Sequence, residues 1–481
     1  MIAAIWTPAP QFANDMADVL RIFLGNVEVL VNAPGGDLTV THTEVVSDGV
    51  RECRVVITGA YAGASRRLQA VCGDALEEKR YHKRQLKGAV YDVMKAATGR
   101  TPPWGSLTGI RPTRLVYAAL NAGQTLEQAT ETVESTFDVR PDKARLLRKI
   151  VTVQQDMSHP RADEVDLYMG IPFCVSRCAY CSFLSGEVGR GDQLLPYVEA
   201  LERETARTLR IVERAGLTPR AFYMGGGTPT ALPAPLLRRA LAAARPFLRA
   251  CREITVEAGR PDTIDREKLS VILDAGAGRI SINPQTMHDE TLARIGRRHT
   301  RAQTEAAYAL ARAMGFHHIN MDLIAGLPGE ELSMFAQTLA WSEAMVPESL
   351  TVHTLSIKRS SLLHLWEAAL PDGAMVEEMV RLGAESAQRR GMRPYYLYRQ
   401  KYMAGNLENV GYALPGHECL YNVDMMEETG SVLAVGAGAI SKRVYPGGGY
   451  IQRAPNVSDI AHYIARADEM AARKDALYPA E

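Results

Sequence analysis

The stretch LYMGIPFCVSRCAYCSF, residues 167–183, joins an apolar run to three closely spaced cysteines. The run is almost continuously apolar, which is typical of a parallel strand that is covered on both faces. Cys174, Cys178 and Cys181 follow it directly, in the spacing C-x-x-x-C-x-x-C. Open α/β sheets and barrels place their ligand sites at the carboxyl ends of such strands. The stretch therefore predicts a buried strand that leads into a thiolate-rich site.

Three thiolates are soft metal ligands, and they favour an iron–sulfur cluster or zinc. A closed structural zinc site needs four ligands, and residues 160–200 contain no fourth cysteine or histidine. On a four-iron cluster, three cysteines leave one iron open to a substrate or cofactor. The spacing thus favours a cluster, with zinc and a loop of free thiols as the alternatives.

Outward from this stretch, short apolar runs alternate with amphipathic helical patterns. The runs lie at residues 166–172, 220–226, 253–259, 279–285, 318–328 and 349–357. Strands and helices that alternate in this way imply a parallel sheet with βα crossovers. Polar residues and glycines collect at the ends of the runs. The fold class is therefore predicted to be α/β, with residues 161–392 as its core.

The two flanking regions have different patterns. Residues 1–160 are predicted to form an N-terminal α+β domain, whose role the sequence does not assign. Its β-branched segments and helical patterns lie at 27–31, 38–46, 51–58, 82–98, 124–136 and 141–157. Residues 393–481 are less regular and rich in tyrosine, and we expect them to cap the open end of the sheet.

The bulk composition excludes several classes of function. Lys+Arg and Asp+Glu both number 55 in 481 residues, so net charge provides no attraction to nucleic acid or anionic membranes. Apolar runs stay below the ~18 residues of a membrane span, and the first residues lack the charged leader of a signal peptide. Seven cysteines are too few for a disulfide scaffold. We expect a cytoplasmic protein without a nucleic-acid partner or membrane span.

The cysteine pattern, with Tyr180 before the last cysteine, resembles the signature of the radical S-adenosylmethionine (SAM) superfamily. The flanking residues resemble the branch that contains oxygen-independent coproporphyrinogen III oxidase, its paralogues and the related heme chaperones. With PWGSLTGIRPTR at 103–114, the chain is similar to the longer coproporphyrinogen dehydrogenase-like subgroup. The resemblance is strong over about 166–445. It implies a partial (βα)6 barrel of radical SAM type with an N-terminal α+β domain and a C-terminal capping region.

The resemblance also implies two cofactors, a [4Fe–4S] cluster on the three cysteines and SAM. Glycines after the second run would let the backbone approach the methionine amino group closely, an arginine suits its carboxylate, and Ile440 would pack on the adenine. An ordinary Arg297–Asp322 ion pair and a core position for Tyr168 are the alternatives. The implied SAM contacts are Tyr168, Gly226, Gly227, Thr228, Glu257, Gln285, Arg297, Asp322, Ser356 and Ile440.

The implied activity is an oxidoreductase reaction of heme biosynthesis. Reductive cleavage of SAM would give a 5′-deoxyadenosyl radical, and coproporphyrinogen III would be oxidatively decarboxylated to protoporphyrinogen IX. An electron donor such as flavodoxin or ferredoxin is expected as a partner, and no catalytic side chain is assigned. The carboxylates of this tetrapyrrole call for basic groups, for which the candidates are Lys358, Arg359, Arg399 and Lys401.

Two positions depart from the patterns of the relatives. Phe183 occupies the place of a further cysteine in the decarboxylases, so the pattern does not decide whether the chain binds a second SAM. Tyr421 occupies the place of the histidine in the His-Asn-x-x-Tyr-Trp segment of the heme chaperones. Met425 and Met426 are expected to pack in the core, with ligation of heme iron by one of them as the alternative. A heme-binding chaperone or transfer protein, a radical SAM enzyme for another tetrapyrrole and a zinc-stabilised structural protein remain as alternatives.

Overall fold

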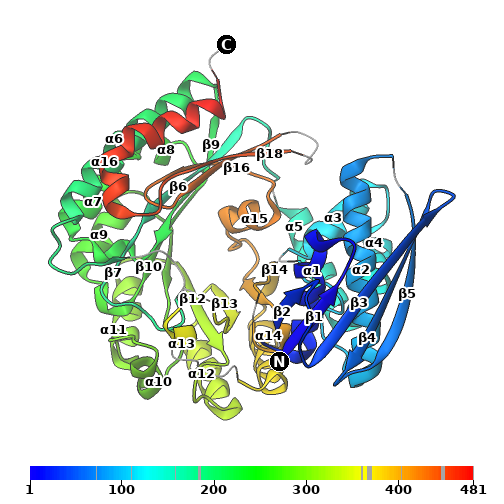
Figure 1. Cartoon of the computed structure of the whole chain (residues 1–481). Coiled ribbons are helices and arrows are strands. Elements are labelled where there is room, and N and C mark those ends of the chain that lie inside the picture. Colours follow the sequence, from blue (N-terminus) through cyan, green and yellow to red (C-terminus); the bar gives the residue numbers. More distant parts are fainter. Residues whose placement is uncertain are drawn as a thin grey trace. The chain divides into compact units, whose positions relative to one another are not determined.

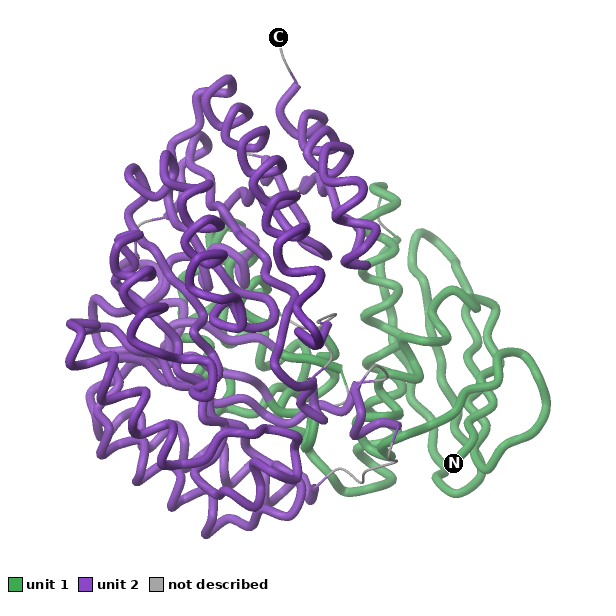
Figure 2. The backbone as a smooth tube through the Cα atoms, turned by 90° about the vertical axis from the view of Figure 1, so that its left-hand side faces the viewer, with its two compact units in different colours: residues 1–148, 399–407 green, residues 149–398, 408–481 purple. Residues whose placement is uncertain are grey.

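The computed structural model describes residues 1–481 except 72, 110, 158, 182–185, 359–360, 366–370, 402, 446–449 and 480–481. The chain forms two compact units, coloured separately in Figure 2. Unit 1 comprises Met1–Arg148 and Arg399–Leu407, and unit 2 comprises Lys149–Tyr398 and Glu408–Glu481. The units reflect compactness alone, so the division into domains at residues 160 and 392 stays a prediction.

Unit 1 is built on a mixed β-sheet. Among the described residues its strands are β1 (Ile2–Trp6), β2 (Glu28–Val31), β3 (Leu38–Ser47), β4 (Val50–Gly59) and β5 (Gly63–Ala70), in the order β2-β1-β3-β4-β5. β1 runs parallel to β2 and β3, whereas β3–β4 and β4–β5 are antiparallel. The strands expected at 27–31, 38–46 and 51–58 are confirmed as β2, β3 and β4.

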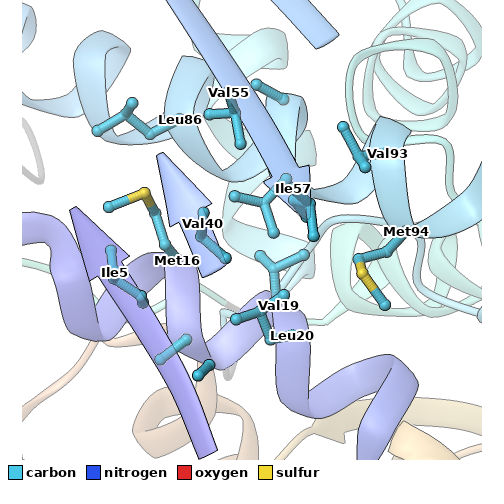
Figure 3. Packing of buried hydrophobic residues seen from close by; sticks show 14 of the residues in the cluster. Ile5, Met16, Val19, Leu20, Val40, Val55, Ile57, Leu86, Val93 and Met94 are labelled. Atoms are coloured by element: carbon cyan, nitrogen blue, oxygen red, sulfur yellow. The ribbon is translucent and has the colours of Figure 1, made fainter. Parts of the chain in front are cut away.

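The core of unit 1 lies between this sheet and two helices. α1 (Ala13–Leu24) and α2 (Ala75–Thr98) contribute apolar side chains that meet those of β3 and β4 (Figure 3). Asp74 caps α2 by accepting from the N–H groups of Leu76 and Glu77, and left-handed Gly99 ends it. The unit also contains α3 (Thr113–Asn121), α4 (Leu126–Phe137) and the start of α5 (Pro141–Asp156).

Unit 2 contains the parallel sheet expected from the six apolar runs. Its consecutive, hydrogen-bonded parallel strands are β6 (Glu164–Ile171), β9 (Thr218–Gly226), β10 (Glu253–Gly259), β11 (Arg279–Ile282), β12 (His318–Ala325) and β13 (Ser349–Thr354). Helices follow the strands and lie along the outer face of the curved sheet (Figure 1). This succession confirms the α/β class and the partial (βα)6 barrel.

The helices of unit 2 are amphipathic, and buried residues recur on one side of each longer helix. Those that connect or follow the parallel strands are α6 (Leu194–Arg214), α7 (Ala234–Ala243), α8 (Arg245–Leu248), α9 (Arg266–Asp274), α10 (Asp289–Arg294), α11 (Arg301–Ala313), α12 (Leu332–Met345), α13 (Leu362–Leu365) and α14 (Gly373–Arg389).

The C-terminal region extends both edges of the parallel sheet. Antiparallel β15 (Asn409–Ala413) and β14 (Arg393–Tyr398) continue it beyond β13. On the other side, β16 (Ser431–Val435) pairs in parallel with β6 and is followed by antiparallel β17 (Ile440–Val444) and β18 (Ile451–Pro455). A further parallel strand therefore stands beside the six that the sequence pattern predicts.

Buried Glu204 on α6 anchors the C-terminal segment to the core of unit 2. Its carboxylate accepts from the N–H of Gly436 at 2.8 Å, from Asn456 Nδ2 at 2.7 Å and from the Tyr463 hydroxyl at 2.5 Å, and it pairs with buried Lys474. Tyr463 belongs to α16 (Ile460–Arg473). Such a charge is tolerated inside a protein only because each oxygen is hydrogen-bonded. The Gly436 loop is thereby fixed beside β6.

No helix in the described part of the chain is both long and apolar enough to span a bilayer.

Candidate active site

The three cysteines lie in the loop that leaves β6. Cys174 ends the short strand β7 (Phe173–Cys174), which pairs with β8 (Gly186–Glu187). The N–H of Cys181 donates to Cys178 O at 3.1 Å, and this turn keeps the last two cysteines together. Cys178 is buried, whereas the side chains of the other two are partly accessible. The sequence-predicted ligands are thus positioned by one tight loop at the carboxyl end of a buried strand.

Buried Arg260 supports the cysteine loop from the end of β10. Its Nη1 donates to Ser176 O at 3.1 Å and to Ser176 Oγ at 2.8 Å, and it approaches Cys178 Sγ at 3.9 Å. Asp262 holds the other side of the guanidinium through two hydrogen bonds. Arg260 thereby fixes the backbone on the N-terminal side of Cys178 and places a positive charge beside its sulfur. Sequence reasoning missed Arg260, although it directly follows the run at 253–259.

The glycine loop, residues 225–228 at the end of β9, packs against the start of the cysteine loop, residues 174–181. Gly227 N–H donates to Ile171 O at 2.8 Å, and Thr228 N–H donates to Phe173 O at 2.7 Å. A Cβ atom on Gly227 would lie only 2.6 Å from Phe173 O. Glycine is therefore required here for close approach of two backbone segments. Thr228 Oγ1 lies 3.5 Å from Cys174 Sγ, so the two predicted motifs meet.

Gly226 has a φ of 105°, a conformation that L side chains rarely adopt, and a Cβ atom there would lie 3.2 Å from the Tyr168 hydroxyl. Glu257 at the end of β10 lies beside this loop and accepts a hydrogen bond from the Tyr223 hydroxyl. A Cβ on Gly225 would be 2.9 Å from Glu257 Oε2. Burial raises the pKa of Glu257 to about 7. The carboxyl group is thus poised to change protonation near neutral pH.

Three tyrosines stack on the inner face of the sheet. Tyr168 on β6 and Tyr223 on β9 are register partners, with ring centroids 6.4 Å apart. Tyr421 stacks on both, at 6.1 Å and 4.5 Å. It comes from α15 (Leu420–Glu427), which lies within the curve of the sheet in Figure 1. Tyr168 is therefore a partly buried strand tyrosine that packs against two other rings.

Gln285 and Arg297 follow β11. The predicted strand at 279–285 ends early, at Ile282, because Pro284 has no N–H for the ladder. Gln285 has a φ of 70° and is tied to β12 by backbone bonds to Asp322 O and Ile324 N. The guanidinium of Arg297 donates to Asn283 O at 2.6 Å.

Arg297 also lies beside the cysteine loop. Burial disfavours its charged form, but Tyr180 and Cys178 hold hydrogen-bonded contacts with it and raise its pKa. Arg297 and Asp322 form no ion pair with each other in the described structure, so the alternative of a simple structural pair is wrong. Arg297 Nε has no hydrogen-bond partner among the described residues although it is buried. A buried donor of this kind suits an anionic ligand.

Asp322 lies on β12, beside β13. Asn320 Nδ2 donates to its Oδ1 at 2.8 Å, and His353 Nε2 lies 3.6 Å from its Oδ2. Burial works toward a higher pKa for Asp322, but these partners hold the pKa below its usual value. Ser356 follows the end of β13, on the same edge of the sheet. Asp322 thus stays an acceptor for hydroxyl groups.

Ile440 begins β17 and is 51% exposed, an unusual position for an isoleucine next to a buried sheet. The Gly436 loop, residues 436–439, joins β16 to β17. Because β16 runs parallel to β6, this loop and Ile440 lie at the carboxyl edge of the parallel sheet. The side chain is therefore accessible from the carboxyl edge of the sheet.

The basic residues that were expected to bind substrate carboxylates lie in different environments. Burial lowers the pKa of Lys358, and nearby Cys181 acts in the opposite direction, so Lys358 lies beside the cysteine loop. Arg399 is buried in unit 1, where it donates to Leu107 O at 2.6 Å and stacks on Trp104. Lys401 pairs with Asp18 at 2.7 Å. Arg399 is thus held by structural partners, whereas Lys401 is 57% exposed beside Asp18, and binding of a substrate carboxylate by either residue stays a prediction. Arg359 and Phe183 lie outside the described residues.

Comparison with known proteins agrees with this fold. The radical SAM superfamily matches residues 168–342, which include the cysteine loop and the strands up to β12. The crystal structure of coproporphyrinogen III oxidase (HemN) from Escherichia coli, a radical SAM enzyme, superposes with a TM-score of 0.51. The match has 22% identity and covers 66% of this chain and 72% of that chain. It establishes a shared fold.

Two curated relatives are similar over most of their length. The oxygen-independent coproporphyrinogen-III oxidase-like protein HemZ of Bacillus subtilis is 41% identical over 78% of this chain and 77% of its own. Heme chaperone HemW of Escherichia coli is 30% identical over 59% of this chain and 71% of its own. The chain belongs to the coproporphyrinogen-III oxidase-like family of radical SAM enzymes. Its cofactors are accordingly a [4Fe–4S] cluster and SAM.

Proposed function

We propose that this protein oxidatively decarboxylates coproporphyrinogen III to protoporphyrinogen IX without oxygen. Two propionate side chains become vinyl groups, and each loses CO2, one hydrogen atom to the SAM-derived radical and one electron to an acceptor. The observation that carries the proposal is the 41% identity to the HemZ oxidase-like protein, which spans both the cysteine loop and the glycine loop. The bound cofactors supply the hydrogen-abstracting radical chemistry, and the chain supplies binding, orientation and exclusion of water.

The residues at the cysteine loop fit an iron–sulfur cluster. Cys174, Cys178 and Cys181 would hold three irons, and one iron would remain for SAM. Arg260 approaches Cys178 Sγ at 3.9 Å, so it would donate toward a cluster sulfur and stabilise the reduced, more negative state. Buried Phe173, directly before Cys174, packs its ring against Tyr197 of α6 and so anchors the start of the loop.

The glycine loop and its neighbours fit the amino-acid end of SAM. The backbone around Gly226 and Gly227 leaves no room for a Cβ, and it presents polar groups beside the carboxyl group of Glu257. We assign the ammonium group of SAM to this corner. Arg297, with its unpartnered buried Nε, would receive the carboxylate, since a guanidinium binds carboxylates in a bidentate fashion.

The remaining SAM contacts would lie along the same edge of the sheet. Asp322 remains ionised and would accept hydrogen bonds from ribose hydroxyls. Gln285 and Ser356 flank it on neighbouring strand ends, and Ile440 would cover the adenine. The Tyr168–Tyr223–Tyr421 stack would form an aromatic wall for a flat tetrapyrrole, and Lys358 is the basic candidate for a propionate.

A heme chaperone is the second candidate, and the 30% identity to HemW favours it. Tyr421, which replaces the chaperone histidine, lies in the aromatic stack and offers no imidazole to heme iron. Met425 and Met426 pack against a buried cluster, in line with the expected core position. The structure of this segment therefore supports turnover over stable heme binding.

An anaerobic assay tests the proposal. Reconstituted protein, reductant, SAM and coproporphyrinogen III are incubated, and 5′-deoxyadenosine, CO2 and porphyrinogen products are quantified together. We expect substrate-dependent 5′-deoxyadenosine, with two equivalents for each protoporphyrinogen IX. SAM cleavage without any tetrapyrrole change would reject the proposed substrate, and stoichiometric heme binding in the same preparation would identify a chaperone. The flavodoxin or ferredoxin donor and the cytoplasmic location stay predictions.

A further inference from the structure

The apolar core of unit 1 ends in a cluster of four metal-ligating side chains, far from the cysteine loop in sequence. His42 and Glu44 are two residues apart on β3, so their side chains leave the same face of the sheet. Cys53 is the register partner of Glu44 on β4. His82 lies on α2, one turn before Leu86, a core residue shown in Figure 3. One ligand atom from each of the four lies within 4.8 Å of the others.

Thr7, which directly follows β1, sets the orientation of the His42 ring. Its Nδ1 lies 2.8 Å from Thr7 Oγ1, which also accepts from the N–H of Ala9 at 3.0 Å. His42 can therefore donate its Nδ1–H to Thr7, which leaves the lone pair of Nε2 for the cluster. A hydrogen bond from the second ring nitrogen is the usual support of a metal-binding histidine.

Three atoms of the cluster are buried without a hydrogen-bond partner in the described structure: His42 Nε2, His82 Nε2 and Glu44 Oε2. His82 Nε2 lies 2.7 Å from Glu44 Oε2, and His42 Nε2 lies 3.7 Å from it, so these atoms contact one another as close ion pairs without well-directed hydrogen bonds. Buried polar atoms almost always have a partner. Three of them around one point indicate a ligand that accepts all three lone pairs.

The donor set and its charge fit zinc. Two imidazoles, a thiolate and a carboxylate are common zinc ligands, and a tetrahedral ion separates them by about 3.4 Å, so shifts of roughly 1 Å suffice. Zn²⁺ with one thiolate, one carboxylate and neutral imidazoles has no net charge. Arg51 lies 3.2 Å from Glu44 Oε2 and is balanced by Glu78 at 2.7 Å.

We propose that these four side chains bind one Zn²⁺ as a structural site that ties β3 and β4 to α2. With four protein ligands the site is closed, which is typical of structural rather than catalytic zinc. A surface cavity of about 320 Å³ is lined by His82, Phe12 and Glu78 among others, so one of the four side chains borders solvent. Binding must displace the proton of the Cys53 thiol, because the thiolate is the form that binds metal. The site is independent of the proposed decarboxylase activity.

The test uses the full-length chain with Cys174, Cys178 and Cys181 changed to Ala, so that neither cluster colour nor those thiols interfere. We expect one Zn²⁺ per chain by elemental analysis. Co²⁺ should give the intense visible bands of a tetrahedral site and a thiolate-to-cobalt charge-transfer band. Cys53→Ser should abolish the charge-transfer band, and His82→Ala should weaken Co²⁺ binding more than about tenfold. Cys251→Ser, which changes a thiol elsewhere in the chain, should alter neither.

Thermal unfolding provides a second measurement on the same chain. Saturating Zn²⁺ should raise the melting temperature of the parent by more than about 5 °C, and this rise should disappear in Cys53→Ser. If a variant does not fold, zinc content and the cobalt spectrum of the parent alone decide the question. Less than about 0.1 equivalent of metal in the parent, or a cobalt spectrum without a thiolate band, would overturn the proposal. In that case the cluster is a metal-free polar network held by Arg51.

Discussion

The cysteine loop of unit 2 and the His42 cluster of unit 1 (His42, Glu44, Cys53 and His82) use similar chemistry but are assembled differently. The cysteine loop places three thiols within eight consecutive residues. The His42 cluster draws on two strands and a helix, and exists only because β3 pairs with β4 in one register and α2 packs over them. Ligands that are close along the chain leave a pattern in the sequence, whereas ligands that are brought together by packing do not.

The largest effect is expected at the cysteine loop. Cys178→Ala removes one of three proposed cluster ligands, so iron content and SAM cleavage should both fall by more than about a hundredfold. Iron analysis, the visible spectrum and 5′-deoxyadenosine formation check this. Cys53→Ser, the matching change in the His42 cluster, should leave cleavage per cluster unchanged. A Cys178→Ala protein that stays brown and active would remove the cysteine loop from the active site.

A smaller loss, of SAM affinity, is expected at Gly227, where the glycine loop contacts the cysteine loop. In Gly227→Ala the new methyl group would lie 2.6 Å from Phe173 O, so the glycine loop must move away from the cysteine loop. We expect SAM to bind about thirtyfold more weakly, equivalent to about 2 kcal/mol, with iron content retained. Equilibrium binding on reconstituted protein measures this. Gly278→Ala is the control, because a Cβ there meets no atom within 4 Å.

Changing Thr7, which contacts His42, should have a milder effect on metal affinity. Thr7→Val preserves shape but removes the oxygen that holds His42 Nδ1 at 2.8 Å. Loss of such a supporting hydrogen bond should weaken Co²⁺ binding about tenfold without removing the thiolate band. Thr43→Val, on the exposed side of the same strand, is the control. Unchanged affinity in Thr7→Val would show that Thr7 does not orient a ligand.

The smallest effect concerns Glu257. Its raised pKa of about 7 means that the carboxylate, which would bind the ammonium group of SAM, is lost as pH falls through this value. SAM affinity should therefore drop about fourfold between pH 8 and pH 6.5. The same shift acts oppositely on stability: the native state favours the proton, so its contribution is full below pH 4.5 and is lost as pH rises through 7.

Titrations of SAM binding at several pH values check the Glu257 prediction. Glu257→Gln should flatten the profile, because glutamine does not ionise in this range. A profile with the same slope in Glu257→Gln would assign the pH dependence to another group.

Much of the fold follows from local pattern. The apolar runs predicted all six consecutive parallel strands, because such strands are covered on both faces and their hydrophobicity is continuous. The pattern overextended β11, since Pro284 interrupts the ladder. It also missed β16, whose parallel pairing with β6 depends on a partner more than 250 residues away. Polar β5 was missed as well, because an exposed edge strand has little apolar alternation to detect.

The candidate site was predictable to a similar degree. The positions of Cys174 and Thr228 follow from the rule that the carboxyl ends of parallel strands share one edge, whereas Asp322 lies within β12. The stacking of Tyr421 on Tyr223, the support from Arg260 and the structural role of Arg399 depend on packing between distant segments. Cys53 is an ordinary buried thiol by sequence alone, and only its three neighbours give it another role.

The sequence by itself determined the family, the parallel core and the cysteine and glycine loops, because each of these is encoded in contiguous residues whose spacing reflects one physical constraint. The tertiary structure alone decided which basic residues have structural partners, how the tyrosines stack and which side chains surround Cys53. These depend on strand register and helix packing, where a shift of one residue would turn His42 and Glu44 to the opposite face of the sheet.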